Sequence, residues 1–192
     1  MNIVIFGAPG SGKGTQSQKI IDRYGLSHIS TGELLRDHIS RGTELGRVAD
    51  SYISQGNLIP DSLMVDVLAH HLDSNPGMLQ KGVIFDGFPR TIPQAQALKE
   101  MLEQRGTTVH GVIGLEVPEE ELMGRMVERG KREGRADDTP ETIKNRLDVY
   151  HRQTAPLQKY YKDGGLYMAV NGHGDVDTIF EGISSHLDRI KA

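Results

Sequence analysis

Short runs of consecutive apolar residues alternate along the chain with longer stretches in which apolar residues recur every three or four positions. The runs predict β-strands, at Asn2–Phe6, Leu26–Ser30, Gly82–Asp86, Val109–Leu115 and Leu166–Val170. Several are apolar throughout, as expected for strands covered on both faces. The longer stretches predict helices, including Gly12–Tyr24, Thr31–Arg41, Asp61–Leu72, Pro93–Arg105, Glu119–Glu128 and Pro140–Tyr161. This order predicts an α/β fold with a doubly wound, five-stranded parallel sheet and helices on both faces.

Two segments do not fit a simple connection between strands. Ser30–Ile59 is too long for one helix and is interrupted by Gly42, Gly46 and Gly56, and Arg129–Asp138 is short and highly charged. We predict that both are mobile inserts on a single domain that spans residues 1–192. After the second segment, Thr139 followed by Pro140 predicts the start of a helix.

The composition narrows the class of protein. A chain of 192 residues is long enough to bury one core, and its formal net charge of −4 argues against a general nucleic-acid-binding protein. There is no cysteine, which excludes disulfides, thiolate catalysis and cysteine-bound zinc. No long apolar stretch and no leader-like pattern precedes the first predicted strand. We therefore expect a cytoplasmic protein with no membrane partner.

The stretch "GAPGSGKGTQ" (Gly7–Gln16) joins the first predicted strand to the first predicted helix. A glycine-rich turn there lets main-chain N–H groups converge on an anion at the helix N-terminus, and Lys13 adds a full positive charge. The stretch matches the phosphate-loop pattern G-x-x-x-x-G-K-[ST] except at its last position, which is Gly14, with Thr15 one residue later. Because Gly14 has no hydroxyl to bind Mg²⁺, we expect the ion to depend on water, nucleotide phosphates and a carboxylate elsewhere.

Asp86 is the candidate for that carboxylate. It ends the apolar run "GVIFD", where the carboxyl end of a parallel strand opens into a ligand crevice, and an Asp there can hold Mg²⁺ through its water shell. Taken alone, Asp86 would be interpreted as a turn residue at the end of a strand. The sequence "DGFPRT" that begins with it places Arg90 at the same edge, which favours the functional interpretation.

Four segments together resemble the adenylate kinase family. They are "GAPGSGKGTQ", "STGELLR" (Ser30–Arg36), "DGFPRTIPQA" (Asp86–Ala95) and a series of arginines from Arg125 to Arg146, in the family's order across nearly the whole chain. The resemblance implies a phosphate-loop (P-loop) kinase that catalyses ATP + AMP ⇌ 2 ADP with Mg²⁺. It also implies a helical AMP-binding insert at residues 30–59 and a short lid at residues 126–138.

The resemblance also implies roles for individual residues. The expected catalytic residues around the phosphates are Lys13, Arg90, Arg125, Arg135 and Arg146. The expected ATP-binding residues are Gly10, Ser11, Gly12, Lys13, Gly14, Thr15, Arg125, Arg129, Gly172 and Gly174. The expected AMP-binding residues are Thr31, Gly32, Arg36, Ile53, Leu58, Ile59, Val65, Gly87, Phe88, Arg90, Gln94, Arg135 and Arg146. Asp86 is the expected ligand of Mg²⁺ through water, and no zinc is expected.

Phosphoryl transfer between two nucleotides requires many positive charges, such as the lysine and arginines listed above. Two nucleotides bring many negative charges together, so the protein has to align them and neutralise the charge on the moving group. Any one of these arginines, taken alone, would be interpreted as a solvated surface charge. Several at motif positions favour a phosphate site.

Two other functions are possible for a chain with this phosphate loop, and they differ from an adenylate kinase in whether and which second nucleotide is bound. UMP/CMP kinases share the phosphate loop and "DGFPR", but they usually carry Ala at the place of Thr31 and an Asn-containing sequence at the place of "TIPQ". A P-loop switch that binds nucleotide without turnover would lack a second nucleotide site, whereas Ser30–Ile59 and Arg90–Gln94 resemble one. We therefore expect a monomer whose partners are ATP, AMP and ADP.

The expected lid is shorter than the lids of better-known members of the family. Only "GKREG" separates Arg129 from Arg135, which is too little for a β-stranded lid, and without cysteine a zinc-bound version is excluded. Asp137 and Asp138 could pair with arginines when the lid closes, or they could be acidic residues that merely precede a helix cap. We expect the lid and the insert to close over the phosphates and exclude water.

Overall fold

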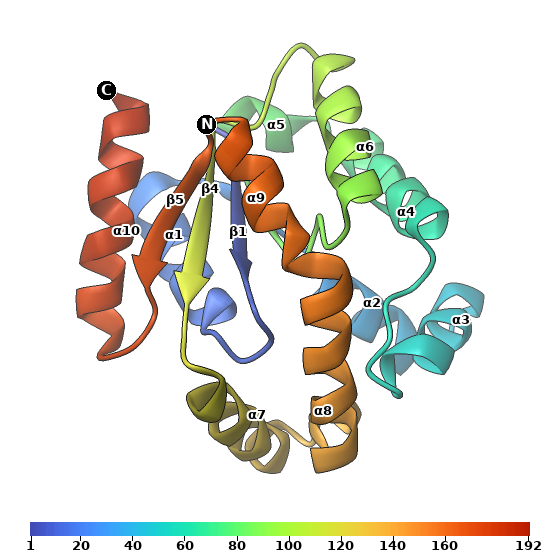
Figure 1. The fold of residues 1–192 in the computed structure, drawn as a ribbon. Helices are drawn as coiled ribbons and strands as arrows, with labels where there is room; N and C mark the ends of the chain where they lie inside the picture. Colours follow the sequence, from blue (N-terminus) through green and yellow to red (C-terminus); the bar gives the residue numbers. More distant parts are fainter.

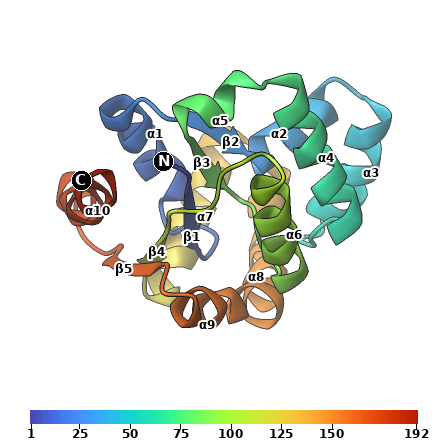
Figure 2. The ribbon, with the colours of Figure 1, turned by 90° about the horizontal axis from the view of Figure 1, so that it is seen from above.

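Five parallel strands form one sheet with helices on both faces in the computed structural model, which describes all residues from 1 to 192 (Figures 1 and 2). The strands lie in the order β2–β3–β1–β4–β5. Their bounds are β1 (Ile3–Gly7), β2 (Ser27–Ser30), β3 (Val83–Asp86), β4 (Gly111–Glu116) and β5 (Tyr167–Asn171). The predicted fold class is confirmed, and each strand lies within about two residues of its predicted position.

Ten α-helices and two short irregular helical segments connect and cover the strands. The α-helices are α1 (Lys13–Tyr24), α2 (Thr31–Ser40), α3 (Glu44–Ile53), α4 (Asp61–Ser74), α5 (Gly77–Lys81), α6 (Ile92–Glu103), α7 (Glu119–Glu133), α8 (Pro140–Val149), α9 (Pro156–Asp163) and α10 (Val176–Lys191). The irregular segments are the 3-10 turn η1 (Ala136–Asp138) and the π-helical η2 (Tyr150–Thr154). The sequence prediction did not include α5 or α10. None of the helices has the length and apolarity needed to cross a bilayer.

The core lies on both faces of the sheet, which explains why the three central strands, β1, β3 and β4, are almost wholly buried. Alternate side chains of β1 point to opposite faces: Val4 and Phe6 pack in one cluster with residues of α4, α6 and α9, while Ile3 and Ile5 pack in another with residues of α1 and α10. Figure 2 shows α1 and α10 on one side of the sheet and α6 on the other. Both clusters fix β1, and therefore the loop that follows it, in a rigid frame.

Residues 30–59 form two short helices and a return segment, of which the sequence predicted only the first helix. Ser30 caps α2 by accepting a hydrogen bond from the N–H of Glu33, and Thr43 caps α3 by accepting one from the N–H of Gly46. A Cβ atom at Gly46 would lie only 2.1 Å from the carbonyl oxygen of His38. Glycine is therefore required for the close approach of α2 and α3.

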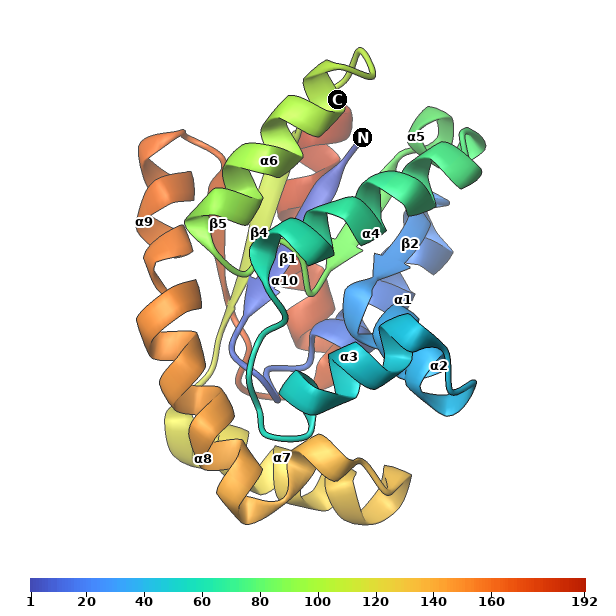
Figure 3. The ribbon, with the colours of Figure 1, turned by 90° about the vertical axis from the view of Figure 1, so that its right-hand side faces the viewer.

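The charged segment Arg129–Asp138 differs from the loop that the sequence predicted. Helix α7 continues past the expected end at Glu128 to Glu133, and η1 follows. Lysine, arginine and glutamate favour helix, and Gly134 ends it with φ +63° and an N–H bond to the carbonyl of Gly130. Figures 1 and 3 show α7 and α8 beyond the carboxyl ends of the strands, where this segment crosses the open edge of the sheet.

The long helix predicted at Pro140–Tyr161 is divided into α8, η2 and α9. Its start is as predicted, because Thr139 caps α8 by accepting a hydrogen bond from the N–H of Thr142 and Pro140 takes the first helical position. Pro156 has no N–H to continue the helical ladder, and the widened turn η2 immediately precedes it. Two side chains of η2, those of Tyr150 and Thr154, line the crevice described next.

Candidate active site

The crevice opens at the carboxyl ends of β1 and β3. Helix α1 leaves β1 on one face of the sheet and α6 follows β3 on the other, so the two connections diverge and leave space between them. Two adjoining hollows occupy this edge. We call the hollow between residues 9–16 and α7 the loop groove, and the hollow between α2, α3, α6 and α8 the insert pocket.

The loop groove is shaped by glycine. Gly10 and Gly12 have φ values of +81° and +95°, a region that other residues rarely adopt. A Cβ atom at Gly10 would also lie 2.9 Å from Cγ of Met126, so glycine lets the loop pack against α7. Lys13 begins α1, and its ammonium donates hydrogen bonds to the carbonyls of Gly7 (2.9 Å) and Ala8 (3.0 Å). The lysine is therefore held directly over the loop.

The ammonium group of Lys13 lies in a cationic environment. Burial, together with the charges of Arg90, Arg146 and Arg129, lowers its pKa to about 7, although the charge of Asp86 opposes the shift. An anion placed among these groups would restore the charged form. The loop groove therefore combines convergent donors with an excess of positive charge, which is the electrostatic pattern of a phosphate site.

Asp86 ends β3 beside Lys13, and only 8% of the residue is exposed. Burial alone would raise its pKa, but the His28 side chain and the charges of Lys13 and Arg90 bring the pKa below its usual value. The carboxylate is therefore ionised and borders the loop groove. No group of three or more metal-ligating side chains exists in the chain. One carboxylate next to a phosphate loop fits Mg²⁺, which keeps most of its water and shares phosphate ligands.

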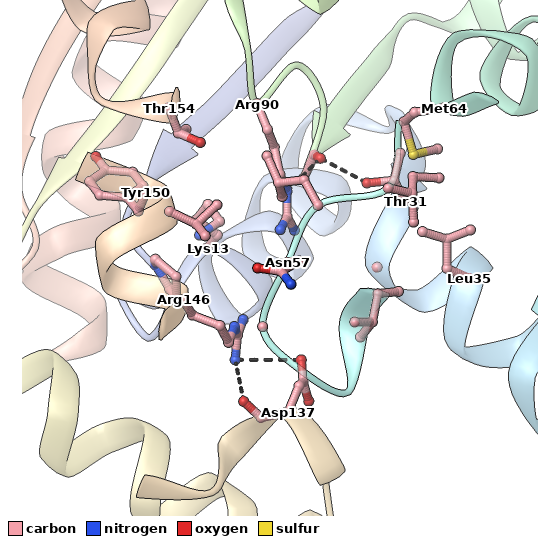
Figure 4. A pocket seen from close by; sticks show the side chains of 18 of the residues that line it. Lys13, Thr31, Leu35, Asn57, Met64, Arg90, Asp137, Arg146, Tyr150 and Thr154 are labelled. Atoms are coloured by element: carbon pink, nitrogen blue, oxygen red, sulfur yellow. Dashed lines mark hydrogen bonds and ion pairs between the residues drawn. The ribbon is translucent and has the colours of Figure 1, made fainter. Parts of the chain in front are cut away.

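The insert pocket has apolar walls with a few fixed polar groups (Figure 4). Its apolar side chains include Leu35, Ile53, Leu58, Ile59 and Met64. The hydroxyl of Thr31 donates to the carbonyl of Gly87 (2.8 Å), and Nε of Arg90 donates to the same oxygen (2.9 Å). The amide of Gln94 is 2% exposed and takes part in hydrogen bonds at both ends, which are described below. Such a pocket suits a flat, mainly apolar ligand with a polar edge.

Two buried carboxylates, Asp137 and Asp138, hold three arginines that border the hollows. The arginines come from α7, from the residue that precedes η1, and from α8. Asp138 accepts two hydrogen bonds from Arg129 (2.6 and 2.8 Å) and one from Arg146 (2.6 Å). Asp137 accepts two from Arg135 (3.0 and 3.2 Å). Burial would raise the pKa of Asp137, but its bond to Arg135 and the charge of Arg146 lower it to about 2. Both aspartates are therefore paired with arginines, and pairing that accompanies closure stays a prediction.

Arg125 reaches the groove from the second turn of α7. It pairs with Glu121 and donates to the carbonyl of Gly172 (3.1 Å), and its Nη1 lies 3.5 Å from the carbonyl oxygen of Gly10. The ring of His173 contacts the other oxygen of Glu121. Arg125 therefore links the phosphate loop to the loop that follows β5.

Most of the predicted site residues line one or both hollows. In the loop groove lie Gly10, Ser11, Gly12, Lys13, Gly14, Thr15, Asp86, Arg125, Arg129 and Gly174. In the insert pocket lie Thr31, Gly32, Arg36, Ile53, Leu58, Ile59, Gly87, Arg90, Gln94, Arg135 and Arg146. Lys13, Arg36, Arg90, Arg135 and Arg146 border both, so the two hollows share a cationic wall.

Three predicted residues line neither hollow. Phe88 is 1% exposed and belongs to the core, Val65 is half-buried and packs against it, and Gly172 is buried with its carbonyl bound to Arg125. The pocket also contains side chains that the sequence did not identify, namely Leu35, Asn57, Met64, Tyr150 and Thr154. Leu35 lies in the segment "STGELLR" next to Arg36, which was a usable signal. Tyr150 and Thr154 come from η2, in the stretch "YHRQTAPLQKYY", which resembles a family signature but to which the sequence assigned no site residue.

Comparisons with known proteins agree over the whole chain. A family model described as adenylate kinase matches residues 5–166. An adenylate kinase of Bacteroides fragilis is 60% identical over 190 residues, which cover 99% of this chain and 100% of the relative. Adenylate kinases of Parabacteroides distasonis (58% over 191 residues, 100% of both chains) and Porphyromonas gingivalis (49% over 191 residues, 100% of this chain and 97% of the relative) are also similar.

Proposed function

Because the chain belongs to the adenylate kinase family, a family of enzymes that transfer a phosphoryl group from ATP to AMP, we propose that the insert pocket binds AMP and the loop groove binds ATP. The observation that carries this assignment is the shared cationic wall, where Lys13, Arg90 and Arg146 border both hollows. A phosphoryl group that moves between two nucleotides has to pass through a region common to both sites. The wall is that region.

On the acceptor side, the proposal assigns the adenine of AMP to the apolar walls and its phosphate to Arg36 and Arg90. Thr31 and Gln94 line the pocket together with its apolar side chains, and an amide can offer both a donor and an acceptor to a purine edge. Arg90 presents a planar fork whose orientation is fixed by its bond to Gly87. Val65 and Phe88 support the pocket from behind its lining.

On the donor side, the proposal assigns the phosphates of ATP to the main-chain N–H groups of residues 10–15 and to Lys13. Arg125, Gly172 and Gly174 lie where the base of ATP would leave the loop. When Mg²⁺ is bound, it neutralises phosphate charge and helps to orient the transferred group. Asp86 would hold the ion through water, since Gly14 supplies no hydroxyl.

During transfer, the chain's own task is to align the phosphates and stabilise the charge that develops between them. Lys13, Arg90, Arg125, Arg135 and Arg146 are the groups proposed to do so. Asp137 and Asp138 hold three arginines in place until phosphate oxygens compete for them. Action as a monomer in the cytoplasm stays a prediction.

A coupled assay of ADP formation tests the function. The purified chain is given MgATP together with AMP, UMP or CMP, and AMP is expected to be preferred. Higher turnover with UMP or CMP would favour a pyrimidine nucleotide kinase, and nucleotide binding without turnover of any monophosphate would favour a switch. Omission of Mg²⁺ in the presence of a chelator is expected to abolish turnover.

The proposal also requires motion, because two nucleotides have to enter a site that excludes water during transfer. We expect the insert (residues 30–59) and the lid (residues 126–138) to close over a dinucleotide inhibitor that spans both sites. Amide hydrogen exchange measured with and without the inhibitor should reveal new protection in these two segments and little change in β1 and β3. Uniform protection, or none in the two segments, would contradict the two-flap mechanism.

A further inference from the structure

The amide of Gln94 is held at both ends by partners that cannot exchange roles. Its Oε1 accepts a hydrogen bond from the main-chain N–H of Arg90 (2.8 Å), and its Nε2 donates to Oδ1 of Asp61 (2.9 Å). A main-chain N–H can only donate, and a carboxylate can only accept. Rotation of the amide by half a turn would face donor with donor and acceptor with acceptor. In a side chain that is 2% exposed, water cannot relieve that mismatch.

Asp61 is itself fixed. The same Oδ1 accepts a hydrogen bond from the hydroxyl of Thr91 (2.9 Å), and that hydroxyl caps α6 by accepting from the N–H of Gln94. Asp61 begins α4, directly after the segment Leu58–Pro60 that returns from the insert. The aspartate does not line the pocket, so it acts on a ligand only through Gln94.

We propose that Asp61 is a positioning residue that sets the order of donor and acceptor which Gln94 offers to a purine, and that it thereby selects a 6-aminopurine against a 6-oxopurine. The inference rests on the proposed function, since it needs a nucleoside monophosphate in the insert pocket. One amide hydrogen and one carbonyl lone pair of Gln94 are left for that ligand.

The chemistry of the two purine classes supplies the selection. The edge of adenine carries an amino donor at position 6 and a ring-nitrogen acceptor at position 1. Hypoxanthine and guanine reverse both, with an oxygen acceptor at position 6 and an N–H donor at position 1. A free amide could serve either class by rotating half a turn, whereas an amide locked by Asp61 and the N–H of Arg90 serves only the first. Selection against the second class then arises because buried polar groups are left unpaired.

The test compares kcat/KM for AMP and for IMP in the wild type and in Asp61→Ala, at saturating MgATP. The selectivity ratio of AMP over IMP is expected to fall about 10-fold or more, mainly through a higher KM for AMP, while the KM for ATP stays the same. Asp61→Asn keeps an oxygen acceptor and should retain more of the ratio than Asp61→Ala. Asp66→Ala, an exposed position on the same helix, serves as the matched control and should leave the ratio unchanged.

A double-mutant cycle separates positioning from a structural role. In the background Gln94→Ala, the further change Asp61→Ala should no longer alter the ratio, because the group through which it acts is gone. If Asp61→Ala fails to fold, the comparison of Asp61→Asn with wild type still tests the ratio. An unchanged ratio in the folded Asp61 variants, or an equal loss in the Gln94→Ala background, would overturn the inference and leave AMP kinase activity standing. A wild-type protein that does not phosphorylate AMP would instead overturn the proposed function.

Discussion

The insert pocket and the loop groove adjoin each other but differ in the polarity of the residues that line them. Of the 25 residues that line the pocket, nine are hydrophobic, whereas only two of the 27 that line the groove are. In the pocket, the polar groups of Thr31 and Gln94 are bound to the protein in a fixed orientation. In the groove, the cations of Lys13 and Arg125 bind carbonyls and a carboxylate of their own chain.

The difference separates recognition of a base from handling of charge. Polar groups that are held in a fixed orientation among apolar side chains discriminate between ligands, because a ligand with the wrong donor or acceptor leaves a buried polar group without a partner. Cations among carbonyls and carboxylates attract any polyphosphate and carry little information about the base. We therefore expect base selectivity to be concentrated on the pocket side and charge stabilisation on the groove side. Two substitutions test that division, and a third tests the wall that the two sites share.

The largest effect is expected on the groove side, from Lys13→Ala. Loss of one preorganised charge-stabilising donor should lower kcat by about 10²-fold or more, with little change in the preference among nucleoside monophosphates. Steady-state kinetics and a thermal melt, which should barely move, provide the measurement. Lys99→Ala, at an exposed position of α6, is the control. Near-normal turnover in Lys13→Ala would remove the phosphate loop from the mechanism.

A smaller effect is expected on the pocket side, from Arg90→Lys. The lysine keeps the charge but loses the planar fork that can hold two phosphate oxygens, so the KM for AMP should rise on the order of 10-fold or more and the KM for ATP much less. Initial-rate kinetics with each substrate varied in turn measure the split. Arg47→Lys, on the exposed face of α3, should have no effect. Wild-type kinetics for AMP in Arg90→Lys would refute bidentate binding.

The smallest effect concerns stability, at the wall that the two sites share. The pKa of Asp137 is lowered from 3.8 to about 2 in the folded protein, so its contribution is present above about pH 4 and is lost as the pH falls toward 2. Asp137→Asn should remove that part of the pH dependence and lower the free energy of unfolding at neutral pH by on the order of 1–2 kcal/mol. Denaturant unfolding at several pH values measures both. Equal acid sensitivity of the two proteins would show that this carboxylate does not carry the effect.

The sequence predicted the features that depend on local pattern. The strands follow from apolar runs, the cap at Thr139 from a short motif, and the loop around Lys13 from glycine spacing between a strand and a helix. The extension of α7 to Glu133 was missed because a run of charges was interpreted as a loop, although those residues are good helix formers capped by Gly134.

Features that depend on distant pairs could not be predicted. Asp61 and Gln94 are separated by 33 positions, and nothing local marks Asp61 as the partner of an amide. The burial of Asp138 among arginines from α7, η1 and α8 likewise needs the tertiary structure. Tyr150 and Thr154 line the pocket from η2, and a local pattern does not show which side chains of that turn face it.

The bonds that Lys13 makes to Gly7 and Ala8 bear on how the enzyme releases its product. A phosphate oxygen that enters the loop takes the ammonium from two carbonyls, and a phosphate that leaves returns it to them. Each binding event is therefore an exchange of partners, in which only the difference between two sets of hydrogen bonds favours the bound state. If the loop binds nucleotide phosphates as proposed, this exchange makes the net gain from Lys13 smaller than its full set of new hydrogen bonds, which favours release of the nucleotide.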